Sequence, residues 1–115
     1  MHDEDTLAIR QVIEDQIAAF QRDDAEAAFR FASPEIQGQF GSALHFLRMV
    51  KTAYYPVYRP RSVIFEKSLM VRGQPALAVL LLAENGQLVR ATYIMQQQSD
   101  RSWRVLGCYL EPLPE

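Results

Sequence analysis

Apolar residues recur at helical spacing through the first part of the chain. The repeat consists of Ile9, Ile13, Ile17 and Phe20. Intervals of three and four residues put these side chains on one face of a helix, so they predict a helix that reaches about Arg22 and packs this face against a core. Asp5 or Thr6 is the expected N-cap, because its side-chain oxygen can accept a hydrogen bond from a free backbone N–H group.

A second helix is predicted over residues 25–32. Asp23 is its expected cap, since Glu26 follows at the spacing of a capping box. Ser33 and Pro34 then end this helix and start another turn, because Ser is a good cap and Pro suits the first helical position.

A third helix is predicted from Ser42, as its cap, to about Tyr54. Pro56 is expected to end it, because proline lacks the backbone N–H that a helix interior needs. Pro56 and Pro60 then favour an extended chain between them, since a residue before proline avoids the helical region.

Two-residue alternation replaces the helical spacing after residue 61. Strands are expected over about 62–71, 75–83, 88–98 and 103–110, with turns at Arg72-Gly73-Gln74, at Asn85-Gly86 and in the polar segment 98–102. Four apolar residues of the first strand share a parity and are expected on one face: Val63, Phe65, Leu69 and Val71. The second strand is apolar at both parities, so we expect it to be central or covered on both faces.

Helices followed by a four-stranded meander predict an α+β fold. The N-terminal helices (about residues 5–54) would pack on one face of a bent four-stranded antiparallel sheet (about residues 62–110). A length of 115 residues favours one domain over residues 1–115. Because the helices cover only one face, we expect a homodimer through the sheet. Candidate residues for that interface are Leu80, Leu82, Ile94 and Leu106.

Composition narrows the functional classes. A formal net charge of −2 argues against nonspecific nucleic-acid binding, which needs a basic surface. Cys108 is the only cysteine, so an intrachain disulfide is impossible, and with two histidines a zinc site or other metal cofactor is not expected. The acidic N-terminus has no apolar run behind it, and the longest apolar run, residues 76–83, is too short to span a membrane. The expectation is a soluble cytoplasmic protein.

Three segments carry a resemblance to known proteins. They are residues 18–41 (AAFQRDDAEAAFRFASPEIQGQFG), 57–65 (VYRPRSVIF) and 102–108 (SWRVLGC). On these segments the chain resembles the nuclear transport factor 2-like superfamily and, within it, a bacterial family described as a domain of unknown function. Many members of that family carry a secretion signal, which is not visible here.

The resemblance implies a cystatin-like cone. A strongly curved sheet would wrap around the long first helix and leave a pocket between its concave face and the helices. Members of the superfamily use this pocket for isomerisation, dehydration, hydrolysis or binding, whereas others fill it and dimerise through the outer sheet face. The fold therefore leaves the function open.

Aromatic and basic residues concentrate at the junction between the helices and the strands. The candidate pocket residues are Phe20, Tyr54, Tyr55, Tyr58, Arg59, Arg61 and Tyr93. Tyrosines can present rings to an apolar ligand and hydroxyls to its polar end, and an arginine can bind a carboxylate. The structural alternative is that the tyrosines wedge helix against sheet, while the arginines pair with Glu66 or with Asp23 and Asp24.

Residues that could perform catalysis lack the expected partners. His45 is the only usable histidine and has no orienting acid, Ser33 is explained as a cap, and Cys108 has no basic neighbour. We therefore expect no catalytic residue and favour a binding module for a small apolar or amphipathic ligand. The alternatives are an isomerase- or dehydratase-like enzyme that uses the same pocket, and a dimeric structural or interaction domain with a filled cone.

Overall fold

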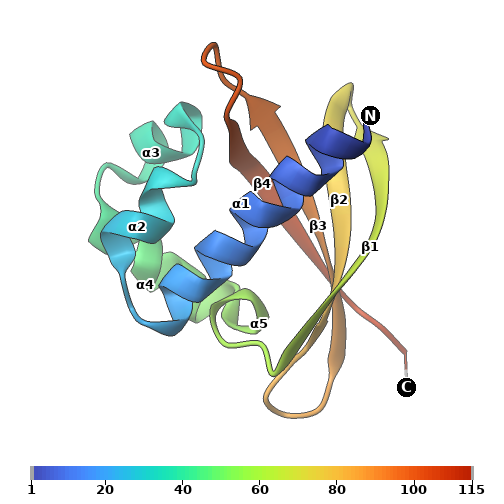
Figure 1. Ribbon diagram of the computed structural model, residues 1–115. Coiled ribbons are helices and arrows are strands. Elements are labelled where there is room, and N and C mark those ends of the chain that lie inside the picture. The colour runs from blue at the N-terminus through green and yellow to red at the C-terminus, as the bar shows by residue number, and fades with distance from the viewer. Residues whose placement is uncertain (1, 115) are drawn as a thin grey trace.

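The computed structural model describes residues 2–114. Within this range the chain forms five helices and then four strands: α1 (Asp3–Gln21), α2 (Ala25–Arg30), α3 (Pro34–Phe40), α4 (Ala43–Ala53), α5 (Tyr55–Tyr58), β1 (Ser62–Val71), β2 (Gln74–Leu82), β3 (Leu88–Gln97) and β4 (Trp103–Pro112). The strands form one antiparallel sheet in the order β1-β2-β3-β4. Figure 1 shows α1 lying across the twisted sheet, with the other helices gathered on the same side. The predicted α+β fold is confirmed.

The first helix begins earlier than the sequence predicted. Its N-cap is His2, and Asp5 and Thr6 lie inside the first turns, so the predicted cap was wrong. Acidic side chains in the first turn favour this earlier start, because they lie next to the positive end of the helix dipole. The predicted apolar face is confirmed, since Ile9 and Ile13 are fully buried.

Two of the predicted caps are confirmed and one is displaced. The Ser33 hydroxyl accepts a hydrogen bond from the N–H of Ile36, and the Ser42 hydroxyl accepts one from His45. The cap of α2 is Asp24 rather than Asp23. Asp23 instead has a left-handed backbone with φ of 56°, at the point where the chain reverses after α1. Its carboxylate binds Tyr58 and Arg59 instead of capping α2.

Pro56 starts a helix instead of preparing an extended segment. It lies in the first turn of α5, where a missing N–H has no cost, so the predicted extended conformation of Tyr58 was wrong. This short helix buries Val57 and Tyr58. The chain becomes extended again at Ser62, where β1 begins as predicted.

The hairpins follow the predicted turn residues. Arg72 and Gly73 both have positive φ, at 50° and 79°, which suits a two-residue turn between strands with right-handed twist. Gly86 also has positive φ, at 86°, in the predicted Asn-Gly turn. The last strand extends two residues beyond its predicted end, since Pro112 pairs with Val89. Proline is tolerated there because β4 is an edge strand.

A bulge in β1 places the four apolar residues that were predicted on one face, Val63, Phe65, Leu69 and Val71, on two different faces of the sheet. Phe65 pairs with Val79, but the next recorded pair is Ser68 with Leu77, so β1 contains one extra residue. An extra residue reverses the alternation of faces beyond it. Val63 and Phe65 pack on the helical core, whereas Leu69 and Val71 belong by register to the opposite face, so the prediction of one face was wrong.

Sheet and helices meet in one buried cluster. The strand residues of this core include Leu77, Val79, Leu81, Ala91, Tyr93, Met95, Trp103 and Val105. Strand β2 is central in the sheet, as its two-sided apolarity predicted. It contributes alternate residues to the core between sheet and helices. Its other parity, which contains Leu80 and Leu82, faces away from the helices.

Candidate functional site

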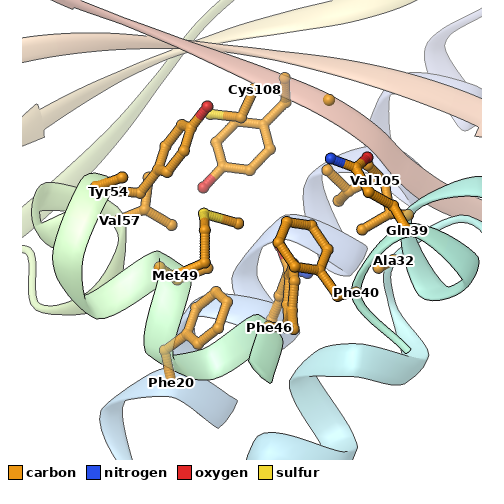
Figure 2. A pocket seen from close by; sticks show the side chains of 16 residues that line it. Phe20, Ala32, Gln39, Phe40, Phe46, Met49, Tyr54, Val57, Val105 and Cys108 are labelled. Carbon is orange, nitrogen blue, oxygen red and sulfur yellow. The ribbon is translucent and has the colours of Figure 1, made fainter. Parts of the chain in front are cut away.

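A cavity of about 370 Å³ lies between the inner face of β3 and β4 and the helices. It is lined by Gln16, Phe20, Ala32, Ile36, Gln39, Phe40, Phe46, Met49, Val50, Ala53, Tyr54, Val57, Tyr93, Val105, Gly107 and Cys108. Figure 2 shows Tyr54 and Cys108 at one end, Val105 and Gln39 at the other, and Met49 pointing into the space between them. The volume falls within the range of about 300–1,000 Å³ that is usual for small-molecule sites.

Helix α4 supplies the aromatic centre of the cavity wall. The ring of Phe46 lies 5.9 Å from Phe20, 5.4 Å from Phe29 and 5.7 Å from Phe40, measured between centroids. Phe46 was not among the candidate pocket residues. Phe46, Leu47 and Val50 recur at helical spacing, a signal that can indicate burial of Phe46 but not that it borders a cavity.

Tyr93 lines the cavity and has a buried hydroxyl group. Its side chain is 1% exposed, and its Oη has no hydrogen-bond partner within residues 2–114. Burial, and then the neighbouring Cys108, raise the pKa of Tyr93 well above its usual value. The group is therefore a neutral phenol at physiological pH, able to donate one hydrogen bond.

Cys108 lies beside Tyr93 and Tyr54. It pairs with Tyr93 in the register of β3 and β4, and burial raises the pKa of its thiol to about 12. The thiol is thus protonated at neutral pH and is a poor nucleophile. Tyr54 directs its hydroxyl end toward this thiol in Figure 2, and burial, then Cys108, raise the pKa of Tyr54 as well.

Two glutamines add polar groups to the lining. The Nε2 of Gln16 donates to the carbonyl of Ala28 at 3.1 Å, which ties α1 to α2 at a buried position. Gln39 is exposed, as is Ala53 on α4, so these two residues mark the side on which the cavity opens to solvent. No charged side chain belongs to the lining within the described part of the chain.

The structure separates the predicted site residues into two groups. Phe20, Tyr54 and Tyr93 line the cavity. Tyr55, Tyr58, Arg59 and Arg61 lie outside its lining. The reason is α5, which turns the junction segment toward the end of α1 instead of along the cavity.

Tyr58 and Arg59 form hydrogen bonds with Phe20 and Asp23, where the chain reverses after α1. The Tyr58 hydroxyl donates to the carboxylate of Asp23, and Arg59 donates to the same carboxylate at 3.1 Å and to the carbonyl of Phe20 at 2.6 Å. The Tyr58 hydrogen bond, with the charges of Arg59 and Lys51, lowers the pKa of Asp23. Tyr58 and Arg59 therefore have a structural role instead of a ligand-binding one, because they join α5 to the end of α1.

The remaining junction residues have surface roles. The Tyr55 hydroxyl donates to Glu84 at 3.3 Å across exposed surface. The side chain of Arg61 is exposed, and its backbone N–H donates to Leu82 at 2.7 Å as β1 begins. Glu66, which was considered as a partner for these arginines, binds Arg90 instead at 2.9 Å.

Of the three catalytic candidates, only Cys108 lines the cavity, whereas His45 and Ser33 lie outside the lining. His45 lies on the exposed side of α4, with Nδ1 3.3 Å from the carbonyl of Phe40, and Ser33 is buried as the cap of α3. Within residues 2–114, no group of three His, Cys, Asp or Glu side chains is placed to hold a metal ion. No helix in the same range is long and apolar enough to cross a membrane.

Comparison with known proteins identifies the family. The family model for a domain of unknown function, DUF4864, matches residues 2–115. The chain belongs to this family. Searches of the curated proteins and of the solved structures each gave no significant match. The DUF4864 match covers the helices, the sheet and the cavity together, so the cavity is built entirely within the family's region.

Proposed function

We propose that this DUF4864 protein binds a small apolar or amphipathic ligand in the cavity, without catalysing a reaction. The observation that carries the proposal is an open space of about 370 Å³ whose walls are aromatic and aliphatic and include few polar groups. Apolar walls with a small number of polar groups are typical of small-molecule sites. The carboxylates and imidazoles that most often perform acid–base catalysis do not belong to the lining in the described residues. The lining does contain Tyr54, Tyr93 and Cys108, but the raised pKa of each of these groups keeps it protonated at neutral pH, so none is a ready base.

A neutral fluorescent probe tests this proposal. N-phenyl-1-naphthylamine fluoresces strongly only in apolar surroundings, so saturable enhancement at micromolar protein would report an accessible cavity. Ala53→Phe adds a ring at an exposed lining position and is expected to weaken probe binding at least about tenfold by blocking the entrance. Thr52→Phe, the adjacent exposed residue outside the lining, is the matched control and should bind like wild type.

Two outcomes of the probe-binding experiment would contradict the proposed ligand site. Equal probe binding by both variants would place the probe elsewhere, and no saturable binding by wild type would remove the support for a ligand site. Near-UV circular dichroism of each variant checks that the tertiary packing is retained.

A homodimer through the sheet is a second candidate. The face of the sheet turned away from the helices contains Leu80, Leu82 and Ile94 by register, and Ile64 on β1 is 56% exposed there. Leu106, the fourth predicted residue, lies at the register shift of β4. Exposed apolar groups on an uncovered sheet face favour association. Sedimentation should give a dimer at micromolar concentration, and Ile64→Glu should shift it toward monomer; a wild-type monomer would contradict the proposal.

Superfamily membership, the number of domains and the cellular location are three further expectations. Helices on one side of a twisted four-stranded meander support membership of the nuclear transport factor 2-like superfamily, with residues 1–115 as one domain. A single cooperative urea transition, monitored by both far-UV dichroism and Trp103 fluorescence, would agree with one domain. Fractionation of bacterial cells that produce the protein tests the expected cytoplasmic location.

A further inference from the structure

The hydroxyl of Tyr93 points to the chemistry of the ligand. It is a buried polar group with no partner in the described residues, and it belongs to a residue that lines a cavity with mostly apolar walls. A buried donor without a partner costs free energy, so such groups are rare in native proteins, and a bound water or a ligand completes the hydrogen bonding of many of them.

No acceptor of the described residues lies within hydrogen-bond distance of the Tyr93 hydroxyl. The side-chain amide of Gln16 donates to Ala28, and Arg59 and Tyr58 are bound to Asp23 outside the cavity. Cys108 is the register neighbour of Tyr93, but its neutral thiol makes no recorded hydrogen bond with the phenol. The Tyr93 donor is therefore left for a molecule inside the cavity.

The lining also limits the charge of that molecule. It contains no Lys, Arg, His, Asp or Glu within residues 2–114, so neither an anion nor a cation would find a compensating charge. Burying an uncompensated charge costs far more than burying a neutral polar group. Of the two arginines that the sequence offers for a ligand carboxylate, Arg59 is paired with Asp23 and Arg61 lies outside the lining.

We propose that the cavity selects a neutral, largely apolar carbonyl compound whose oxygen accepts a hydrogen bond from the Tyr93 hydroxyl. A carbonyl oxygen is the best match, because it accepts the phenolic proton and brings no donor of its own that would need a partner. The rings of Phe46, Phe40 and Tyr54 suit a flat hydrocarbon body beside it. This inference rests on the proposed binding function and specifies its ligand class.

Three probes of nearly equal shape test the inference by calorimetry. They are 2-acetonaphthone, 2-isopropenylnaphthalene, in which a CH₂ group replaces the carbonyl oxygen, and the anion 2-naphthoate. Each is measured with wild type and with Tyr93→Phe, which removes only the hydroxyl. The ketone should bind Tyr93→Phe about tenfold more weakly than wild type, whereas the hydrocarbon should bind both proteins within about twofold. The anion should bind wild type at least about a hundredfold more weakly than the ketone.

The carbonyl stretching band of bound 2-acetonaphthone gives an independent measurement. It should lie at lower frequency in wild type than in Tyr93→Phe, because a hydrogen bond weakens the C=O bond. A role for Tyr93 in packing alone would not move this band.

The outcomes separate this inference from the proposed function. Equal effects of Tyr93→Phe on ketone and hydrocarbon would overturn the hydrogen-bond assignment and leave ligand binding intact. Binding of 2-naphthoate as tight as that of the ketone would overturn the selection for neutral ligands. If none of the probes bound wild type, the binding function and the inference would fail together.

Discussion

Tyr93 on β3 and Cys108 on β4 are direct cross-strand neighbours, and both side chains line the cavity. The pair is neutral, because burial raises the pKa of the phenol well above its usual value and that of the thiol to about 12. The chemistry of this wall is therefore that of a hydrogen-bond donor and a small apolar group, not that of a base or a nucleophile.

Removing the Tyr93 hydroxyl should not destabilise the free protein. Its Oη has no partner within residues 2–114, so Tyr93→Phe is expected to leave the free energy of unfolding unchanged or to raise it by up to about 1 kcal/mol. Tyr58→Phe is the matched control and should be destabilising, because its hydroxyl binds Asp23. Urea unfolding measures both, and a clear loss of stability in Tyr93→Phe would show that the hydroxyl is already satisfied.

Cys108 should react slowly with neutral thiol reagents in the folded protein. A shift of the thiol pKa from 9.0 to about 12 lowers the thiolate fraction at pH 8 about a thousandfold relative to an unshifted thiol. Iodoacetamide labelling followed by mass spectrometry compares the native chain with the chain in urea. Labelling at equal rates would contradict a thiol whose raised pKa keeps it protonated. Occupation of the cavity by 2-acetonaphthone should slow the native rate further.

Asp23 should make stability depend on acid pH. Its folded pKa is lowered by the Tyr58 hydrogen bond, so its contribution is present above the unfolded pKa near 3.8 and is lost as pH falls through the lower folded value. Asp23→Asn keeps a residue that tolerates positive φ but removes the charge. The stability difference between wild type and this variant should be largest above about pH 5 and should shrink below about pH 4 in urea titrations.

A difference that stayed constant with pH would contradict this account of Asp23. Asp24→Asn is the control at the adjacent residue. Asp24 caps α2, and an asparagine cap is nearly as good as aspartate, so this variant should be only slightly destabilised.

Phe46 should be the most costly single truncation on α4. Its ring is buried and contacts the rings of Phe20, Phe29 and Phe40, so Phe46→Ala is expected to lower the free energy of unfolding by about 3–5 kcal/mol. Leu44→Ala on the exposed side of the same helix should cost less than about 0.5 kcal/mol. Similar costs for the two variants would contradict the central position of Phe46.

Local sequence signals determined most of the secondary structure. The helical spacing from Ile9 to Phe20, the Ser33 and Ser42 caps and the Asn85-Gly86 turn each act over a few residues, so they are readable without knowing the fold. The same local reasoning was wrong for Pro56, because a proline that ends one helix is equally suited to begin the next.

The site depended on contacts between residues far apart in the chain. The sequence left Arg59 open to a ligand carboxylate or to pairing with Glu66, Asp23 or Asp24. The reversal at Asp23 decided between them, because it brought a carboxylate and the Phe20 carbonyl to the guanidinium. Likewise, alternation placed Tyr93 on a strand face but could not show that its hydroxyl would lack a partner. Pairings of this kind arise from packing and sheet register, where a one-residue bulge is enough to move a side chain to the other face, so they are set by the tertiary structure.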